Sequence, residues 1–325
     1  MFKSFLGLLI VFALLAPETR AAEKKGGLVL QFDDGWSIWA TFIAPELQKV
    51  GGKATGFVNN QNIANGRITA ENLLTLQNTY HWEIGTHTWH HLNAPSAIRK
   101  TGLAPWRTGE LNKSITELRA LGLNVHALVF PFNAYTPELA QAVQPLVESY
   151  RRTETLAIAD AVSPDKSVPA TAIDMAHYVP PALLRKWIDL AASKDSLLFL
   201  YGHRILPDSS FATGRVVSVT ATTLTAELPV ILPEGSSLVL VPDISRRPPP
   251  PTYFQVTSAT NTTITVDHPD LAKLTSPGAI FMIGEAYSTR LSDFRTLLEY
   301  AAERMPFYTL HEVAGRSQKT GVSSQ

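Results

Sequence analysis

Short apolar runs alternate along the chain with longer segments in which apolar residues recur every three or four positions. Leu28–Phe32 is the first such run and predicts a buried strand at 27–33, whereas Ser37–Val50 has the spacing of a helix. Further strands are expected at 53–58, 82–85, 125–130, 147–150 and 196–200, and further helices from 69 and at 110–121, 135–147 and 183–192. Strands that alternate with helices indicate βαβ units, so the sequence predicts an α/β fold with a parallel sheet or barrel.

The pattern changes to period-2 alternation between residues 211 and 288, where Val, Thr, Ser and Pro are frequent. This alternation predicts a small antiparallel β unit. Residues 217–225 and 238–241 resemble residues 254–266 and 280–283, so we expect two hairpin-plus-strand halves of a small barrel or sandwich. Pro248–Pro251 is expected to connect the halves as a stiff, extended segment.

The helical pattern returns at Leu291–Arg304, and a short strand is expected at 307–310. The β-rich unit is therefore interpreted as an insertion into the α/β domain, with its two ends close together. The domain prediction places a signal peptide at 1–21, the α/β domain at 22–210 and 289–315, the inserted β-rich domain at 211–288 and a disordered tail at 316–325.

The first residues predict export. Lys3 precedes the apolar run Phe5–Leu15, and small residues lead to Ala21, which is the order found in secretory signal peptides. An uncleaved membrane anchor is the alternative, but the run is shorter than the roughly 20 apolar residues that span a bilayer. We expect a periplasmic or extracellular protein with no transmembrane segment after cleavage.

The composition narrows the choice of partners and ligands. The 28 Lys and Arg residues balance 28 Asp and Glu residues, so the chain has no broad positive field that would bind nucleic acid. The chain contains no cysteine, which excludes disulfides and thiolate metal ligands. Any metal ion must therefore be bound by His and carboxylate side chains.

Two short motifs supply such side chains. Asp33 and Asp34 follow the first strand, and adjacent carboxylates suit a division of labour in which one binds a metal and the other accepts a proton. Taken alone, the pair could equally form a turn whose side chains cap backbone groups. His87 and His91 are four residues apart, which would place both imidazoles on one face of a helical turn. Together with Asp34 they would leave open positions on a Zn²⁺-like ion, as a hydrolytic metal site requires.

The order of the motifs resembles the polysaccharide deacetylase family, the NodB-homology domain of carbohydrate esterase family 4. The resemblance rests on Phe32-Asp33-Asp34-Gly35, His87-Thr88-x-x-His91, Phe130-Pro131-Phe132 and Leu200-Tyr201-Gly202-His203, and it covers residues 27–205 and 289–313. It implies an irregular (β/α) barrel of the NodB-homology type, with the small all-β domain as an insertion.

The resemblance also implies roles for individual residues. Asp33 would be the catalytic base and His203 the general acid. One divalent metal ion, with Zn favoured and Co, Ni, Mn or Fe as alternatives, would be bound by Asp34, His87 and His91. The backbone N–H of Phe132, after Pro131, would help to hold the oxyanion. The implied protein is a secreted, metal-dependent hydrolase that removes N-acetyl groups from a carbohydrate polymer.

Departures from the family pattern leave alternatives open. The family often has an arginine in the third motif, whereas this chain has none there, so Arg151 or Arg152 is expected to supply that charge from the next strand. Asp174 is a candidate partner for His203 or else a surface cap, and Trp36 is expected either to stack on sugar rings or to pack. Hydrolysis of another non-peptide C–N bond or of an O-acetyl ester, and non-catalytic glycan binding, are the alternative functions.

Overall fold

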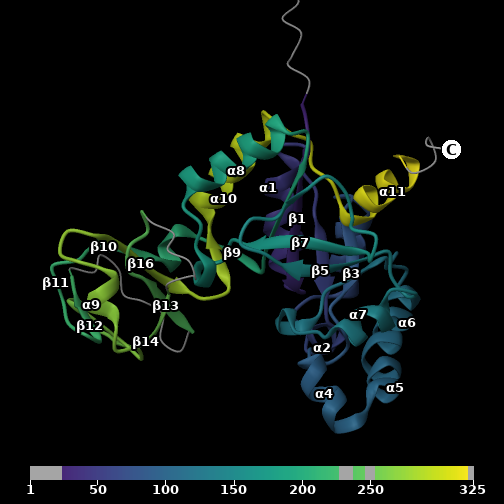
Figure 1. Ribbon diagram of the computed structural model, residues 1–325, viewed down its shortest axis with the longest axis horizontal. Helices are drawn as coiled ribbons and strands as arrows, with labels where there is room; N and C mark the ends of the chain where they lie inside the picture. Colours follow the sequence, from purple (N-terminus) through teal and green to yellow (C-terminus); the bar gives the residue numbers. More distant parts are fainter. Residues whose placement is uncertain (1–23, 227–236, 246–252, 321–325) are drawn as a thin grey trace, which may run out of the picture.

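The computed structural model describes residues 24–226, 237–245 and 253–320. The predicted signal peptide and the proline-rich connector lie outside these ranges. A parallel barrel and a separate antiparallel β domain lie side by side, with the β domain on the left in Figure 1. Within the described ranges, no helix combines the length and the apolar character that crossing a membrane requires.

The barrel is formed by parallel strands that close on themselves. In spatial order they are β1 (Gly27–Asp34), β2 (Thr55–Val58), β3 (Glu83–Thr86), β4 (Ala127–Leu128), β5 (Ser149–Thr153), β7 (Ser167–Ala172) and β8 (Leu197–Gly202). Strand β8 also pairs with β1, which closes the ring, and the short β6 (Ile158–Ala159) pairs with β8 in the antiparallel direction. The predicted (β/α) barrel with an added antiparallel unit is thus confirmed.

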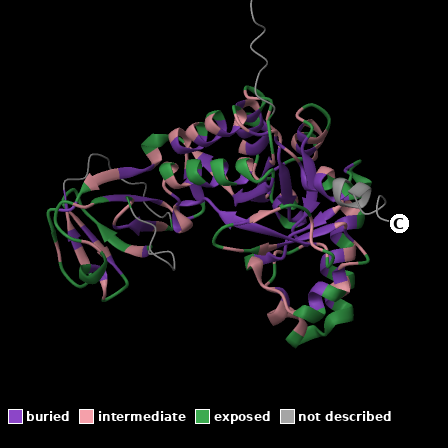
Figure 2. Ribbon diagram, turned by 45° about the horizontal axis from the view of Figure 1, so that its top comes forward, coloured by how far each residue is buried: buried purple, intermediate pink, exposed green. Residues whose placement is uncertain are grey.

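Strand β1 shows why the barrel strands are apolar on both faces. Leu28 and Leu30 pack in a large core with the surrounding helices, whereas Val29 belongs to a second core that contains Phe199 from β8. Because successive side chains of a strand point to opposite faces, the second core is the barrel interior. The barrel strands are buried almost throughout, as Figure 2 shows in purple. A continuous apolar run is what a strand covered on both faces requires.

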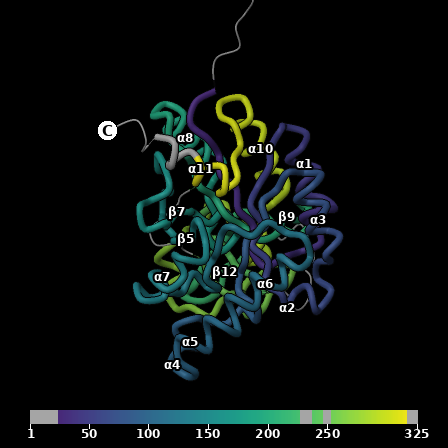
Figure 3. The backbone as a smooth tube through the Cα atoms, turned by 90° about the vertical axis from the view of Figure 1, so that its right-hand side faces the viewer, coloured from purple at the N-terminus to yellow at the C-terminus, as the bar shows by residue number. Residues whose placement is uncertain are grey.

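Helices surround the barrel and connect its strands. They are α1 (Ala44–Gln48), preceded by a π-helical turn at Trp39–Ile43, α2 (Asn60–Ala64), α3 (Ala70–Asn78), α4 (Ala94–Thr101), α5 (Leu103–Trp106), α6 (Lys113–Ala120), preceded by a π-helical turn at Arg107–Asn112, α7 (Pro137–Val143), α8 (Pro181–Ser193), α10 (Leu291–Ala302) and α11 (Leu310–Thr320). Helices α8 and α10 lie against each other although the β domain separates them in sequence. Helices α4 and α5 project from one end of the barrel, as the tube in Figure 3 shows.

Two elements differ from the sequence prediction. Strand β7 was not predicted, because Pro169 and several small residues interrupt its apolar pattern, and proline argues against a central strand. The strand expected at 307–310 was wrong: Phe307 makes one isolated bridge with Leu28, and Leu310 begins α11. Helix α11 continues to Thr320, so residues 316–320 are helical rather than part of a disordered tail, and 321–325 lie outside the described ranges.

The β domain is one antiparallel sheet. Its strands are ordered β10 (Ala212–Arg215), β16 (Ile280–Glu285), β13 (Leu238–Val241), β14 (Phe254–Ala259), β15 (Thr263–Val266), β12 (Thr223–Thr225) and β11 (Ser218–Val219). The two repeats suggested by the sequence each supply a hairpin and a strand. They join where β12 pairs with β15 and where β13 pairs with β16.

The chain enters and leaves the β domain at neighbouring points. Strand β9 (Arg204–Leu206) pairs in parallel with β17 (Ser288–Arg290), which confirms that the ends of the insertion lie close together. An apolar cluster that contains Met175, Phe211 and Met282 joins the β domain to the loop after β7. The β domain is therefore fixed against the end of the barrel at which His203 lies.

Candidate active site

The acidic pair lies at the carboxyl end of β1. Asp33 is 2% exposed and lies on the same face of β1 as Val29, so its side chain points into the barrel. At Asp34 the backbone turns, with a φ of 80°. The carbonyl oxygen of Asp34 accepts hydrogen bonds from the side-chain amides of Asn59 (3.1 Å) and Asn62 (3.0 Å), which hold this turn. The two carboxylates therefore face different surroundings: Asp33 the barrel interior and Asp34 the open end.

His87 and His91 meet Asp34 from the loop after β3. Oδ1 of Asp34 lies 3.3 Å from Nε2 of His91 and 3.7 Å from Nε2 of His87. The loop is not helical, so the expected helical turn was wrong; positive φ angles at Thr88 (64°) and His91 (57°) bring the rings together instead. The structure nevertheless places the three predicted metal ligands in one group.

The surroundings of His87 prepare it to bind a metal. Nδ1–H donates to the carbonyl oxygen of Val129 at 2.7 Å, which leaves Nε2 as the unprotonated nitrogen. Burial lowers the pKa of the His87 imidazole to about 4, so the ring is neutral at physiological pH. Two imidazole nitrogens and one carboxylate oxygen are donors that suit Zn²⁺, and the residues present therefore fit the implied ion.

Arg151 from β5 binds Asp33. Nη1 of Arg151 donates to Oδ1 of Asp33 at 2.8 Å, Nη2 donates to Oδ2, and both side chains are buried. Burial alone would raise the pKa of Asp33, but the charge and hydrogen bonds of Arg151 outweigh it and hold the pKa below its ordinary value. The sequence left Arg151 and Arg152 as alternatives. Arg152, which we placed at the site, points to the other face of the strand and pairs with Glu154.

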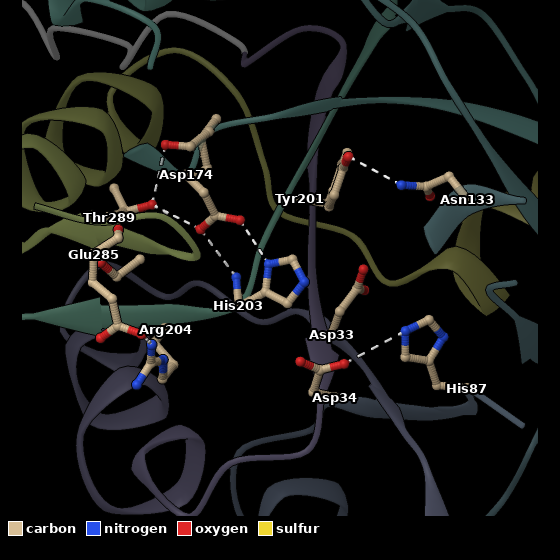
Figure 4. Close-up of polar contacts among 12 residues, drawn as sticks. Asp33, Asp34, His87, Asn133, Asp174, Tyr201, His203, Arg204, Glu285 and Thr289 are labelled. Atoms are coloured by element: carbon tan, nitrogen blue, oxygen red, sulfur yellow. Dashed lines mark hydrogen bonds and ion pairs between the residues drawn. The ribbon is translucent and has the colours of Figure 1, made fainter. Parts of the chain in front are cut away.

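His203 and Asp174 form a second polar pair. Nδ1–H of His203 donates to Oδ2 of Asp174 at 2.6 Å, and the backbone N–H of His203 donates to Oδ1 at 3.2 Å (Figure 4). Burial by itself lowers the pKa of His203, but the Asp174 carboxylate more than offsets this effect and raises the pKa to about 9. A Cβ on Gly202 would lie 3.0 Å from Oδ1 of Asp174, so glycine permits this close approach. Asp174 is thus the partner of His203 and not a surface cap.

These groups line one cleft at the carboxyl end of the barrel strands. Its volume is about 680 Å³, and its lining includes the acidic pair, Arg151, Asp174 and four histidines: His87, His91, His177 and His203. In Figure 4 the two aspartates lie between His203 and His87. Pro131 is buried, and the Trp36 ring packs against the guanidinium groups of Arg67 and Arg204; neither Pro131 nor Trp36 is among the residues that line the cleft.

Two exposed aromatic rings flank the histidines. Phe132 is 64% exposed, and its ring centroid lies 4.8 Å from that of His91. Tyr287 is 54% exposed, and its ring centroid lies 5.2 Å from that of His203. Tyr287 precedes β17 and belongs to the predicted insertion, so the β domain contributes directly to the cleft. The sequence analysis missed Tyr287, because nothing in its local sequence signals a place at the cleft.

Strained backbone is concentrated at the site. Among the described residues other than glycine, positive φ angles occur at Asp34, Thr88, His91, Phe132 and Asn133, and at three positions elsewhere. Such angles cost free energy for residues with a Cβ, so they persist where the surrounding structure enforces them. The concentration in these three loops supports a functional role for this end of the barrel.

A family model for polysaccharide deacetylases matches residues 20–146. That segment is similar to the polysaccharide deacetylase family. The matched segment contains Asp33, Asp34, His87 and His91. It ends before three residues of the site: Arg151, Asp174 and His203. The roles of these three therefore rest on the geometry of the cleft.

Several solved structures are distantly similar. A polysaccharide deacetylase from Bacillus cereus aligns over 43% of this chain and 44% of its own, at 17% identity and a TM-score of 0.35. A family 4 carbohydrate esterase from Streptomyces lividans in complex with acetate aligns over 56% of this chain and 80% of its own, at 14% identity and a TM-score of 0.39. A family 4 pseudoenzyme from Bacillus anthracis aligns over 55% of both chains, at 13% identity and a TM-score of 0.36.

The chain thus spans less than half the length of the Bacillus cereus protein. The sequence matches no curated protein.

Proposed function

We propose that this protein is an exported, metal-dependent hydrolase that removes N-acetyl groups from a carbohydrate polymer. The observation that carries the proposal is the convergence in one cleft of three groups: a buried Asp33–Arg151 pair, a His203–Asp174 pair, and a cluster that fits a divalent ion. Export follows from the predicted signal peptide, and a mature chain that begins at Ala22 would support it.

The cluster that would hold the ion consists of Asp34, His87 and His91. When bound, Zn²⁺ would act as a Lewis acid toward the acyl carbonyl and toward water. The protein fixes the donor atoms in advance, because the Val129 carbonyl orients His87 and two asparagine amides hold the turn at Asp34. Less reorganisation of these side chains is then needed when the ion binds.

Asp33 is the proposed base. It adjoins Asp34, lines the cleft and is kept ionised by Arg151, so it can accept a proton from the attacking water. The guanidinium also fixes both carboxylate oxygens, which limits the orientations that Asp33 can adopt. A proton transferred to Asp33 must leave before the next turnover.

His203 is the proposed acid. Its Nδ1 is occupied by Asp174, so Nε2 is the nitrogen that remains to donate a proton to the departing amine. Protonated His203 supplies that proton, and cleavage of the C–N bond then releases an amine rather than an amide anion. The backbone N–H of Phe132 is the proposed donor to the oxyanion.

Two aromatic rings favour a carbohydrate substrate. Phe132 and Tyr287 present exposed faces beside His91 and His203, and apolar faces of sugar rings pack on such side chains. An O-acetyl ester could react at the same cleft, since hydrolysis of an ester and of an amide both need an activated water. Ester hydrolysis is therefore the second candidate.

Acetate release tests the proposal. The purified mature protein should release acetate from N-acetylated glycans, lose this activity in excess chelator, and recover it when Zn²⁺ is restored. The matched control is Asp33→Asn, which alters the base and leaves the proposed ligands in place. Acetate release from O-acetylated glycans alone would favour the esterase, whereas no release from either panel by zinc-loaded protein would favour a non-catalytic glycan-binding protein.

A further inference from the structure

A second group of possible metal ligands lies at the other end of the barrel. It consists of His126, Glu148 and His311 and is called here the His126 cluster. His126 directly precedes β4, Glu148 directly precedes β5, and His311 is the second residue of α11. Because the barrel strands are parallel, these amino-terminal strand ends face away from the cleft. In Figure 1, α11 lies at the end of the barrel opposite α2 and α7.

The carboxylate of Glu148 lies between two imidazoles. Its Oε1 is 3.0 Å from Nδ1 of His126, and its Oε2 is 2.7 Å from Nδ1 of His311. The two rings are stacked, with centroids 4.2 Å apart and an interplanar angle of 24°. One ligand atom from each residue lies within 4.8 Å of the other two, as in the cluster of the cleft.

The helix that carries His311 is fixed to the barrel through its first residues. The backbone N–H of Leu310 donates to Oγ1 of Thr55 at 3.1 Å, and the backbone N–H of His311 donates to Oε2 of Glu83 at 2.8 Å. Leu310 and Val313 also belong to the core of the barrel interior. The three ligand residues therefore come from distant parts of the sequence but are held on one rigid frame.

The dimensions are compatible with Zn²⁺. Bonds of about 2.0–2.1 Å at tetrahedral angles place neighbouring ligand atoms about 3.3 Å apart. The donor atoms of the His126 cluster are within 4.8 Å, and the side chains are 32%, 40% and 51% exposed, so small rotations can bring them together. The donor set of two imidazoles and one carboxylate is the one that Zn²⁺ accepts in proteins.

A buried carboxylate lies next to the His126 cluster. Glu83 is 7% exposed, and its Oε2 accepts the N–H of His311. Its Oε1 has no hydrogen-bond partner among the residues that the structure describes. An unpaired buried carboxylate oxygen is costly, and a nearby cation would reduce that cost.

We propose that the His126 cluster binds a second Zn²⁺ ion, which fixes the start of α11 to the amino-terminal end of the barrel and takes no part in the reaction. Ligands from three separate segments make such an ion a cross-link between the last described helix and strands β4 and β5. A metal that binds only the folded arrangement of these segments stabilises the folded state. The competing arrangement is a metal-free one, in which both imidazoles donate to Glu148.

Zinc binding to the chelator-treated full chain tests the proposal. Asp34→Ala removes the ligand of the cleft, so this variant should bind one Zn²⁺ per chain by calorimetry and elemental analysis, and the double variant Asp34→Ala/His126→Ala should bind none. The unsubstituted chain should bind two. Zinc at a hundredfold excess over Kd should raise the Tm of Asp34→Ala by about 5 °C and leave that of the double variant unchanged.

Controls separate the His126 cluster from surface histidines and from misfolding. His268 is an exposed histidine of the β domain, and Asp34→Ala/His268→Ala should still bind one Zn²⁺. Asp34→Ala/His311→Gln keeps a hydrogen-bonding side chain next to Glu148, and it too should lose the ion while keeping the circular dichroism spectrum of the parent.

Equal zinc binding by Asp34→Ala and by both cluster variants would overturn the proposal, as would an Asp34→Ala protein that binds no zinc. If the unsubstituted chain and Asp34→Ala each bound one ion that was lost in the cluster variants, the His126 cluster would stand. In that case the metal assignment in the cleft would fail.

Discussion

The guanidinium of Arg151 binds both carboxylate oxygens of Asp33, and both side chains are buried. The two residues lie on β1 and β5, which are not neighbours in the barrel, so the pair crosses the barrel interior. A buried carboxylate without this partner would be protonated more easily and would be free to rotate. The pair therefore links the stability of the barrel to the protonation state of the proposed base.

Replacing Arg151 tests that link. Arg151→Met should lower kcat for acetate release by about a hundredfold and should destabilise the fold by about 3–5 kcal/mol, because it leaves a buried charge unpaired. Urea unfolding measures the second effect. The neighbouring Arg152→Met is the matched control: its side chain does not line the cleft and pairs with the partly exposed Glu154, so kcat should stay within about twofold. Equal losses of kcat in both variants would contradict the assignment to Arg151.

The adjacent aspartates should be separable by metal content. Asp34→Ala removes a proposed ligand and should lose the zinc of the cleft, whereas Asp33→Asn should keep it and lose at least a thousandfold in kcat, since the base is gone. Elemental analysis and acetate release, measured on the same preparations, give the two readouts. If both variants lost the same amount of zinc, the division of labour between the two carboxylates would be wrong.

The pair of His203 and Asp174 predicts how activity depends on pH. Asp174 raises the pKa of His203 to about 9, so the protonated acid persists up to that pH, and activity falls as pH rises through the pKa. In Asp174→Asn the burial of the ring acts without the carboxylate, and the pKa should fall below the ordinary value of 6.5. The basic limb of the kcat profile should therefore move to lower pH by at least two units. An unchanged basic limb would assign the acid role to another group.

The site illustrates what sequence patterns predict well. The first two motifs follow predicted strands, and parallel strands end at one edge of the barrel, so their meeting in space could be predicted without coordinates. The helical turn between His87 and His91 was predicted wrongly, because Thr88 and His91 adopt positive φ angles that residues with a Cβ seldom adopt. The two histidines could be grouped correctly although the conformation of their loop was predicted wrongly, since chelation requires only that their nitrogens converge.

The features of the site that the sequence analysis did not predict depend on strand register and on packing between domains. Choosing between Arg151 and Arg152 requires the exact register of β5, because successive side chains point to opposite faces. Strand β7, which leads to Asp174, was hidden by Pro169 and small residues. Tyr287 lies in the cleft only because the β domain packs against the loop after β7, and contacts between domains leave no periodic signal in the sequence.

The insertion can be removed at positions that the strand pairing defines. Replacing residues 207–287 by a Gly/Ser linker of about six residues keeps β9 and β17, and with them Thr289, whose Oγ1 lies 3.1 Å from the carbonyl oxygen of Ile173. The variant should bind zinc and cleave small N-acetylated substrates, but it should lose activity on long polymers. Removing Thr289 as well should weaken the loop that carries Asp174. Equal loss on short and long substrates, with zinc retained, would show that the β domain completes the catalytic site.

Tyr287 gives the sharper test of the β domain. Its exposed ring lies beside His203, whereas that of Phe132 lies beside His91, so the two rings can contact different sugar units of one chain. Losing one aromatic face costs about 1–1.5 kcal/mol, so Tyr287→Ala should raise KM for long N-acetylated glycans about tenfold. The KM for a monomeric substrate should change little. Tyr287→Phe keeps the ring and should behave as the unsubstituted protein, whereas a loss in Tyr287→Phe equal to that in Tyr287→Ala would assign the effect to the hydroxyl group. A fall in kcat with unchanged KM would place Tyr287 in the chemistry of His203 and not in binding.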